Sequence, residues 1–327
     1  MRILIVGGTR FVGRHIVHAA LRAGHEVTLF NRGRSGSDLF PDVPHLTGDR
    51  DGDLSALASS EWDATVDTCA YVPRQVHALA DALGERGGQM VFISSVSVYG
   101  APTIGYDEQS PLIELGDPTV ETITNDTYGG LKVLSERAAT ERFGADTLLV
   151  RPTYVVGPDD HTYRFPWWVS RLARGGEVLA PGPADDPAQV IDARDMATWI
   201  VSMIERRAPG VFHTVGPEQP ITWGQLLETI AAQVAPPGTA LSWVPASLLR
   251  EEGLDGMTLP LWAGDEPDAL MSAASPAAAL AAGLRIRPLS ETIADTLEWT
   301  RTHDRPAHIG LDPKREAAIL ERWRAAR

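Results

Sequence analysis

The N-terminal segment constrains the fold of this chain more than any other part of the sequence. The apolar run Ile3–Val6 leads into the glycine-rich turn Gly7–Gly13, and an amphipathic stretch at 12–23 follows. A buried strand, a glycine turn and a helix start in this order are typical of a dinucleotide site, because the helix N-terminus offers N–H groups and a positive dipole to a pyrophosphate. Gly7 permits the tight turn, and Gly13 lets helix and sheet approach closely. A simple strand-to-helix turn is the alternative.

Short apolar runs alternate with helical patterns through the first half of the chain. This alternation predicts an α/β fold with a doubly wound parallel sheet of the Rossmann type, because right-handed crossovers place helices on both faces. We expect helices at 12–23, 73–84 and 128–142. The expected buried strands are Ile3–Val6, Val27–Phe30, Ala64–Thr68, Met90–Ser94 and Thr147–Arg151.

After Pro152 the sequence changes in character. Pro, Gly and Trp cluster at 157–187 and 236–267, which predicts a smaller α/β substrate lobe. Between these clusters, the strand Val190–Ile191, a helix at 194–206 and the strand Val211–Val215 resemble the first lobe again. We therefore expect a Rossmann domain at 1–152 with returning segments at about 188–217, and a substrate lobe at 153–187 and 218–303. A C-terminal helical tail at 304–327 carries alternating charges and is expected at the surface; helices are predicted at 288–303 and 313–325.

The composition limits the partners and the compartment. The 327 residues include 29 Lys and Arg against 43 Asp and Glu, a net charge of −14, which argues against a nucleic-acid partner. The single cysteine, Cys69, cannot form an internal disulfide and indicates a reducing compartment. No run approaches the roughly 18 apolar residues of a membrane span. We expect a cytoplasmic protein with a small-molecule substrate and no membrane association.

The end of the second predicted strand indicates which dinucleotide is bound. An acidic residue there would bind the ribose 2′-hydroxyl of NAD, but the sequence has Asn31 and Arg32, with Arg34 close behind. Arg10 projects from the glycine turn, and with Arg32 it could hold a 2′-phosphate through charge-assisted bonds of about 1.5–3 kcal/mol each. The sequence therefore favours NADP(H), with NAD(H) as the alternative if these arginines are only solvated surface residues.

Two serines at the end of a predicted strand, and a tyrosine–lysine pair on the next helix, indicate acid–base chemistry. Ser94 and Ser95 lie at the carboxyl end of a predicted strand, where ligands bind in such folds. Tyr128 and Lys132 are four apart, so they share one face of the next helix. A lysine ammonium lowers the pKa of a nearby phenol, and a serine hydroxyl can polarise a carbonyl oxygen. An ordinary helix-surface pair is the alternative reading of Tyr128 and Lys132.

Together these motifs resemble the short-chain dehydrogenase/reductase superfamily, in its extended or atypical epimerase/dehydratase-like branch. The resemblance implies that Tyr128 is the acid or base, that Lys132 holds the nicotinamide ribose and that Ser95 fixes the reacting oxygen. It also implies that Asp49 reaches the adenine, that Pro152 and Thr153 flank the nicotinamide, and that the protein forms a homodimer. The full set of expected cofactor-binding residues is Gly7, Thr9, Arg10, Phe11, Val12, Gly13, Asn31, Arg32, Asp49, Arg50, Cys69, Ser94, Tyr128, Lys132, Pro152 and Thr153.

Departures from the family pattern narrow the expected reaction. Sugar-nucleotide dehydratases of this branch carry an Asp-Glu pair where this chain has Val96 and Ser97, and epimerases carry a diphosphate-binding arginine where it has Pro187–Val190. Arg10 resembles an atypical subgroup that includes chloroplast stem-loop RNA-binding proteins. The favoured function is an NADPH-dependent oxidoreductase that moves a hydride between the nicotinamide and a carbonyl or hydroxyl carbon. The alternatives are a sugar epimerase that recycles its cofactor and a non-catalytic dinucleotide-sensing or RNA-binding protein.

The remaining candidates concern the substrate and a metal. Candidate substrate residues are Tyr71, Ser97, His161, Arg164 and Trp168, although core packing is the favoured role of the aromatic group Tyr163, Phe165, Trp167 and Trp168. The run Asp159–His161 lacks a second histidine at ligand spacing, so we expect a turn there and no metal. A small core residue is the alternative role for Cys69. Asp192, Arg194 and Asp195 are expected to join the two lobes by capping and ion pairing.

Overall fold

The computed structural model describes residues 1–36, 38–264 and 268–325. The chain divides into two compact units, each built from three segments. The first unit contains Met1–Thr153, Ala193–Val215 and Ala274–Arg285, and the second contains Tyr154–Asp192, Gly216–Ala273 and Ile286–Arg327. No helix among these described residues is long and apolar enough to cross a membrane.

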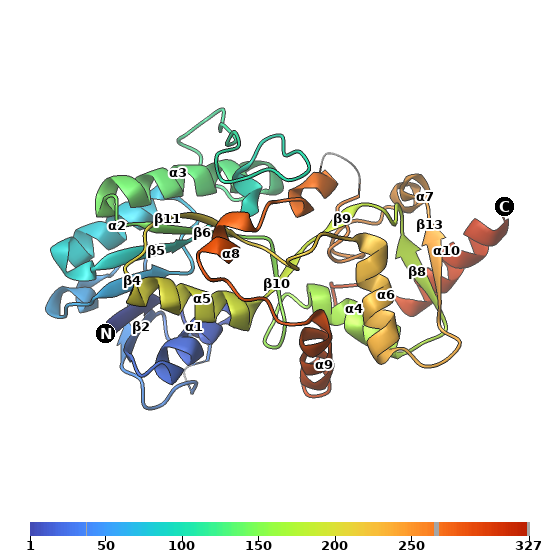
Figure 1. Cartoon of the computed structure of the whole chain (residues 1–327), viewed down its shortest axis with the longest axis horizontal. Coiled ribbons are helices and arrows are strands. Elements are labelled where there is room, and N and C mark those ends of the chain that lie inside the picture. Colours follow the sequence, from blue (N-terminus) through green and yellow to red (C-terminus); the bar gives the residue numbers. More distant parts are fainter. Residues whose placement is uncertain (37, 265–267, 326–327) are drawn as a thin grey trace. The chain divides into compact units, whose positions relative to one another are not determined.

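The first unit is built on a seven-stranded parallel sheet of order β11-β6-β5-β4-β1-β2-β3 (Figure 1). Its central strands are nearly continuous buried runs, as expected where helices cover both faces. The direction of strand order reverses between β1 and β4, where Val6 is aligned with Asp67. Their carboxyl ends therefore form the edge at which such sheets bind ligands. The strands are β1 (Arg2–Val6), β2 (Glu26–Asn31), β3 (His45–Thr47), β4 (Ala64–Asp67), β5 (Gln89–Ile93), β6 (Leu148–Pro152) and β11 (Gly210–Thr214).

Helices cover both faces of this sheet, which confirms the predicted doubly wound α/β class. Helices α2 (Pro73–Leu83) and α3 (Asn125–Phe143) pack together on one face, and α1 (Phe11–Arg22) and α5 (Ala193–Glu205) on the other (Figure 1). Apolar side chains such as Leu4, Leu79 and Phe92 are fully buried beneath them. The short elements are α8 (Ala277–Ala281) and the 3-10 helices η1 (Ser55–Ser59), η2 (Gly84–Gly87) and η3 (Val96–Val98).

The second unit has helices around three two-stranded ladders. Its core contains Tyr163, Phe165, Trp167 and Trp168, so the expectation that this aromatic group packs a core is confirmed. The strands are β7 (Tyr154–Val156), β8 (Glu177–Pro181), β9 (Pro187–Ala188), β10 (Val190–Asp192), β12 (Ile221–Thr222) and β13 (Ala240–Val244). The helices are α4 (Arg164–Ala173), α6 (Trp223–Val234), α7 (Ala246–Glu251), η4 (Asp268–Ser272), α9 (Leu289–Thr300) and α10 (Pro313–Ala325).

The division of the chain differs from the expected domain boundaries in three places. Strand β10 pairs with β7 in the second unit, whereas the prediction placed 188–192 with the Rossmann domain. Residues 274–285 return to the first unit, where α8 contacts β11, and this return was not predicted. Helix α10 is not a separate surface tail, because its Ile319, Leu320 and Glu316 are buried, and Glu316 pairs with the buried Arg171 at 2.8 Å.

Candidate active site

The glycine turn between β1 and α1 has the backbone of a ligand cradle. Gly7 and Gly8 have φ values of +105° and +87°, a region that residues with a Cβ rarely occupy. A Cβ on Gly13 would lie 2.7 Å from the backbone nitrogen of Gly8, so only glycine permits this approach. The N-cap residue Arg10 makes no side-chain capping bond to the helix. The first N–H groups of α1 therefore have no side-chain cap from Arg10 to compete with a pyrophosphate.

Three arginines lie near the ends of β1 and β2. Arg10, Arg32 and Arg34 are all exposed. Among the described residues, no hydrogen bond or ion pair engages their guanidinium groups. Asn31 ends β2 and accepts the Gly33 N–H through Oδ1 at 2.8 Å, while its buried Nδ2 has no protein partner within the described ranges. This corner of the unit therefore offers cations and an amide donor to an anionic, hydroxylated ligand, and no carboxylate ends β2 to repel a phosphate.

A tight turn follows β3. Within it, the Asp49 N–H donates to the Asp53 carbonyl and the Gly52 N–H to the Asp49 carbonyl, both at 2.9 Å. Asp49 is half-buried, and its Oδ1 also accepts the Asp51 N–H at 3.1 Å. These bonds fix the carboxylate to which the family resemblance assigns the adenine.

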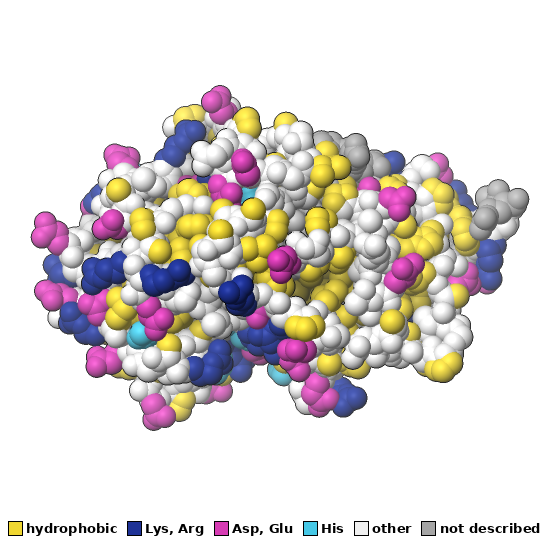
Figure 2. Space-filling model, in the orientation of Figure 1, with side chains coloured by type: hydrophobic (Ala, Val, Ile, Leu, Met, Phe, Trp, Pro, Cys, Tyr) yellow, Lys and Arg dark blue, Asp and Glu magenta, His cyan; other side chains and the backbone are white. Residues whose placement is uncertain are grey.

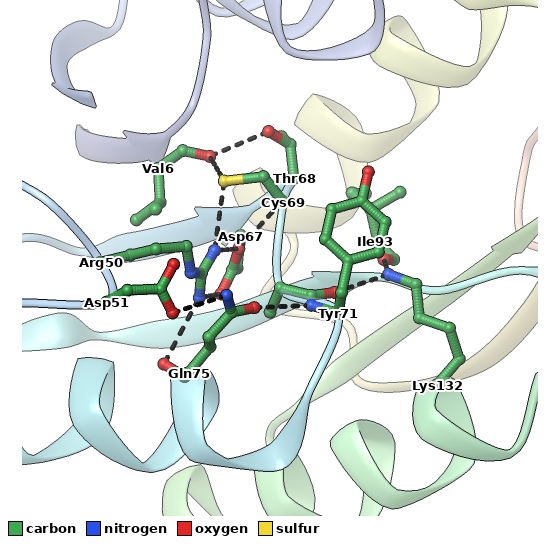
Figure 3. Close-up of polar contacts among 11 residues, drawn as sticks. Val6, Arg50, Asp51, Asp67, Thr68, Cys69, Tyr71, Gln75, Ile93 and Lys132 are labelled. Atoms are coloured by element: carbon green, nitrogen blue, oxygen red, sulfur yellow. Dashed lines mark hydrogen bonds and ion pairs between the residues drawn. The ribbon is translucent and has the colours of Figure 1, made fainter. Parts of the chain in front are cut away.

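Arg50 connects this turn to the end of β4. Its guanidinium donates two bonds of 2.8 Å to the carboxylate of Asp67 and a third, of 3.1 Å, to Cys69 Sγ (Figure 3). Burial alone would favour the neutral acid, but the charge and hydrogen bonds of Arg50 outweigh it and lower the pKa of Asp67. Arg50, expected among the cofactor residues, therefore makes a buried ion pair. Cys69 accepts that bond, and burial raises the pKa of its thiol.

The same network reaches the glycine turn. Thr68 Oγ1 donates to the carbonyl of Val6 at 2.9 Å, and Cys69 Sγ donates to it at 3.7 Å (Figure 3). Val6 is the residue that precedes Gly7. The glycine turn, the Asp49 turn and the end of β4 are thus joined by hydrogen bonds. Sequence reasoning missed Asp67 as part of this assembly, although a carboxylate at the end of a buried strand is a signal that could have found it.

Lys132 is the best-defined polar group near the predicted catalytic pair. It is buried on α3, and its Nζ donates bonds of 2.8 Å to the carbonyls of Ala70 and Ile93, which follow β4 and end β5 (Figure 3). Burial lowers the pKa of this amine to about 8. Nζ also lies 4.9 Å from the centre of the Phe92 ring. An ammonium has three donors, so one N–H remains for a ligand or for a neighbouring phenol.

Tyr128 lies one turn before Lys132 and is half-buried. The start of α3 is fixed by a capping box, in which Thr124 Oγ1 accepts the Thr127 N–H and Thr127 Oγ1 accepts the Thr124 N–H. The Tyr128 N–H then donates to the Thr124 carbonyl at 3.0 Å. This well-capped first turn holds the phenol on a rigid element.

The serines come from the segment after β5. Ser95 caps η3, where its Oγ accepts the Ser97 N–H at 3.1 Å and donates to Ser97 Oγ at 3.0 Å. This segment contacts α3 closely, because a Cβ on Gly129 would lie 2.0 Å from the Ser97 carbonyl oxygen. The structure therefore brings Ser95 and Ser97 to the turn of α3 that carries Tyr128. Ser94 is buried, and its Oγ has no protein partner among the described residues.

A second buried network of polar side chains connects α3 to β6. Glu136, one turn after Lys132, receives bonds of 2.9 and 2.6 Å from Arg151 on β6. Arg151 also donates to the hydroxyl of Tyr99 at 2.6 Å, and that hydroxyl lies 2.6 Å from His213 Nε2. All four side chains are buried. Burial lowers the pKa of His213, which favours the neutral ring.

The other candidate substrate residues lie in different surroundings. Trp168 is fully buried in the second unit, where its indole donates to the Pro260 carbonyl, in agreement with the favoured packing role. Arg164 is half-buried over the ring of Tyr154, and its Nε donates to Thr162 at 3.1 Å. His161 is exposed in the same unit, next to the turn in which the Thr162 N–H donates to Asp160 at 3.0 Å.

A parallel sheet with a glycine turn after its first strand and a tyrosine–lysine pair on a later helix defines a class of dinucleotide-dependent proteins. Residues 3–69 and 55–214 match the sequence model of the NAD dependent epimerase/dehydratase family, and the chain belongs to this family. The expected resemblance is thereby confirmed.

Two curated relatives and one solved structure illustrate the breadth of the family. The chain is 26% identical to the chloroplast stem-loop binding protein of 41 kDa b of Arabidopsis thaliana, covering 70% of this chain and 62% of that protein. It is 27% identical to 2′-dehydrokanamycin reductase of Streptomyces kanamyceticus, covering 77% and 72%. It spans only 49% of the length of other curated relatives that it matches. The Bordetella bronchiseptica enzyme WbmH, solved with NAD+, has the same fold with a TM-score of 0.70 at 16% identity, over 92% of this chain and 99% of that one.

Proposed function

We propose that this protein is an NADPH-dependent oxidoreductase that acts on a carbonyl or hydroxyl carbon of a small molecule. The observation that carries the proposal is the placement of Tyr128 on a capped helix turn, one turn before a buried Lys132 and against the serine segment at Ser95. These are the three groups that proton transfer to a carbonyl oxygen requires.

The family's dinucleotide fits the residues of the first unit. Arg10, the N-cap residue after the glycine turn, makes no side-chain capping bond to α1, and Asp49 is fixed for an adenine. Pro152 and Thr153 are expected beside the nicotinamide. In the proposed choice of NADP(H), Arg10 and Arg32 bind the 2′-phosphate; their lack of carboxylate partners in the described part of the chain supports this. When bound, a nicotinamide supplies or accepts the hydride.

The chain's own side chains then handle the oxygen and its proton. When substrate binds, the hydroxyl of Ser95 turns its one hydrogen from Ser97 Oγ to the substrate oxygen and orients that oxygen. The phenol of Tyr128 gives the oxygen a proton during reduction or takes one during oxidation. The ammonium of Lys132, held by two backbone carbonyls, favours the phenolate by its charge. Its third N–H is left for the nicotinamide ribose, the role that the family resemblance assigns to it.

Cofactor preference is tested by binding. We expect tighter binding of NADPH than of NADH, and Arg32→Ala should weaken NADPH by about 10- to 150-fold, the equivalent of about 1.5–3 kcal/mol for a charge-assisted bond. Arg22→Ala, a change at another exposed arginine of this unit, is the matched control. A preference that survives Arg32→Ala unchanged would refute the assignment.

Reduction and epimerisation are separated by the fate of the cofactor. The reductase relative from Streptomyces supports net hydride transfer, which consumes NADPH as a carbonyl compound is reduced. An epimerase would instead copurify with its dinucleotide and regenerate it in each turnover. A screen of carbonyl compounds for loss of reduced nicotinamide absorbance, together with analysis of any copurified nucleotide, decides between the two.

RNA binding is the second candidate, because one relative is named as a stem-loop binding protein. The net charge of −14 weighs against it, and on the face shown in Figure 2 basic side chains are interspersed with acidic ones. Filter binding of a structured RNA across a salt series tests this function. Retention that falls steeply with salt would support it, since phosphate contacts release counterions.

A further inference from the structure

The ring of Tyr71 is an exposed aromatic surface beside the proposed catalytic pair. Tyr71 follows β4 and is 40% exposed, whereas Phe92 and Tyr99 in the same unit are buried. Its ring centre lies 6.4 Å from that of Tyr128 and 5.0 Å from Lys132 Nζ. A large apolar ring left partly in water at this position can gain free energy by covering itself with a ligand.

The backbone around Tyr71 is fixed on both sides. Its own N–H donates to Gln75 Oε1 at 2.8 Å, and the carbonyl of the preceding Ala70 accepts from Lys132 at 2.8 Å (Figure 3). Gln75 is held in turn, because its Nε2 donates to Asp51 at 2.9 Å. Tyr71 is thus mounted on the same network that joins the Asp49 turn to β4, and it presents a pre-positioned ring.

The surface that the ring presents is mainly apolar and flat. Within the described part of the chain its hydroxyl makes no hydrogen bond or ion pair, so the ring is not committed to another structural contact through its polar end. Ring pairs with centres about 4.5–7 Å apart adopt offset or edge-to-face contacts, so a planar group bound next to Tyr128 would lie within stacking range of Tyr71. A saturated ring of similar size lacks the flat face that stacking on Tyr71 needs.

We propose that Tyr71 forms a substrate subsite beside Tyr128 and selects carbonyl compounds whose carbonyl carbon bears a planar aromatic group. The inference rests on the proposed oxidoreductase function, since the substrate oxygen is placed at Tyr128 and Ser95. The inference adds the class of substituent that the carbonyl carbon carries. Tyr71 acts through stacking and takes no part in proton transfer.

Two ketones of matched size test the subsite. Acetophenone carries a planar ring, and cyclohexyl methyl ketone carries a saturated one. Their dissociation constants are measured by NMR titration of the protein saturated with NADP+, which requires no turnover, and their kcat and KM values are measured with NADPH. The variants are Tyr71→Leu, which keeps apolar bulk without a ring, and Tyr71→Phe, which keeps the ring. Ile104→Ala, at an 83% exposed apolar side chain of the same unit, is the control.

We expect the wild type to prefer acetophenone by about two- to tenfold in affinity and KM, since ring stacking adds to area burial. Tyr71→Leu should reduce this preference to about one, whereas Tyr71→Phe and Ile104→Ala retain it. Equal binding of the two ketones by the wild type would overturn the proposal, as would a Tyr71→Leu effect confined to NADP+ affinity, which would place the ring against the cofactor. If acetophenone binds through Tyr71 but no ketone is reduced, the subsite stands and the oxidoreductase function fails.

Discussion

Gly129 offers a sensitive test of the close contact between α3 and the serine segment. A methyl group at this position would lie 2.0 Å from the carbonyl oxygen of Ser97, against the roughly 3 Å that a real Cβ contact needs. The obstacle is backbone, so it cannot rotate away. Gly129→Ala must therefore move the start of α3 and η3 apart by about 1 Å. Because Tyr128 and Ser95 lie on the two sides of this contact, their separation changes with it.

The expected loss of activity in Gly129→Ala follows from how precisely catalytic groups must be positioned. A misplacement of about 1 Å at a catalytic group can cost about a hundredfold in rate, so kcat/KM should fall by about that factor. Within a helix, alanine is favoured over glycine by about 1 kcal/mol, so a loss of stability on substitution would itself show that the clash outweighs helix propensity. The measurements are kcat/KM with saturating NADPH for a carbonyl substrate found in the screen, and the midpoint of thermal unfolding.

Gly116→Ala is the control. A Cβ there would meet no other atom of the described residues within 4 Å, so activity should stay within about threefold of the wild type. If Gly129→Ala keeps wild-type kcat/KM and unfolding midpoint, the contact between Tyr128's helix turn and the serine segment is not as close as described. Tyr128 and Ser95 would then not share a site.

Three further outcomes are expected. Gly13→Ala should abolish detectable NADPH binding in a fluorescence titration, because its methyl group would meet the Gly8 backbone at 2.7 Å; undiminished binding would contradict the assigned cradle. Lys132, with a pKa of about 8, should lose its charge above that pH, so kcat/KM declines there, and a decline that persists unchanged in Lys132→Arg must have another source. His213 has a lowered pKa in the folded protein. As pH falls below about 6.5, the unfolded chain therefore takes up a proton before the folded protein does, and the free energy of unfolding decreases. His213→Gln should reduce this pH dependence of the free energy, measured by urea unfolding between about pH 5 and 7.

The sheet and the motif residues could be predicted because their signals are local. Each central strand is a short apolar run between polar turns, and the observed β1 and β5 differ from the predicted runs by no more than one residue at either end. The glycine turn and the spacing of Tyr128 and Lys132 are likewise contained in a few adjacent residues. Chain order and strand polarity then place these motifs at one edge of the sheet.

The interactions that connect these motifs could not be predicted from the sequence. Arg50 pairs with Asp67 and Gln75 with Asp51, each across a gap of 17 or more residues that carries no periodic signal. The return of 274–285 to the first unit was missed for the same reason, since this stretch is rich in alanine and its burial depends on β11. Trp168 showed that an aromatic cluster near a predicted substrate loop does not distinguish a ligand wall from a core.

The role of Tyr128 is tested most directly by Tyr128→Phe, which removes one hydroxyl and keeps the ring. Two quantities are measured on the same preparation: the dissociation constant of NADPH, and the rate at which deuterium at the transferable position of NADPH appears in the reduced product. If Tyr128 is the acid, we expect an NADPH dissociation constant within about twofold of the wild type and a transfer rate lower by about 10²–10⁴, the usual contribution of a positioned acid. Deuterium transfer at the wild-type rate in Tyr128→Phe would contradict the acid role of Tyr128.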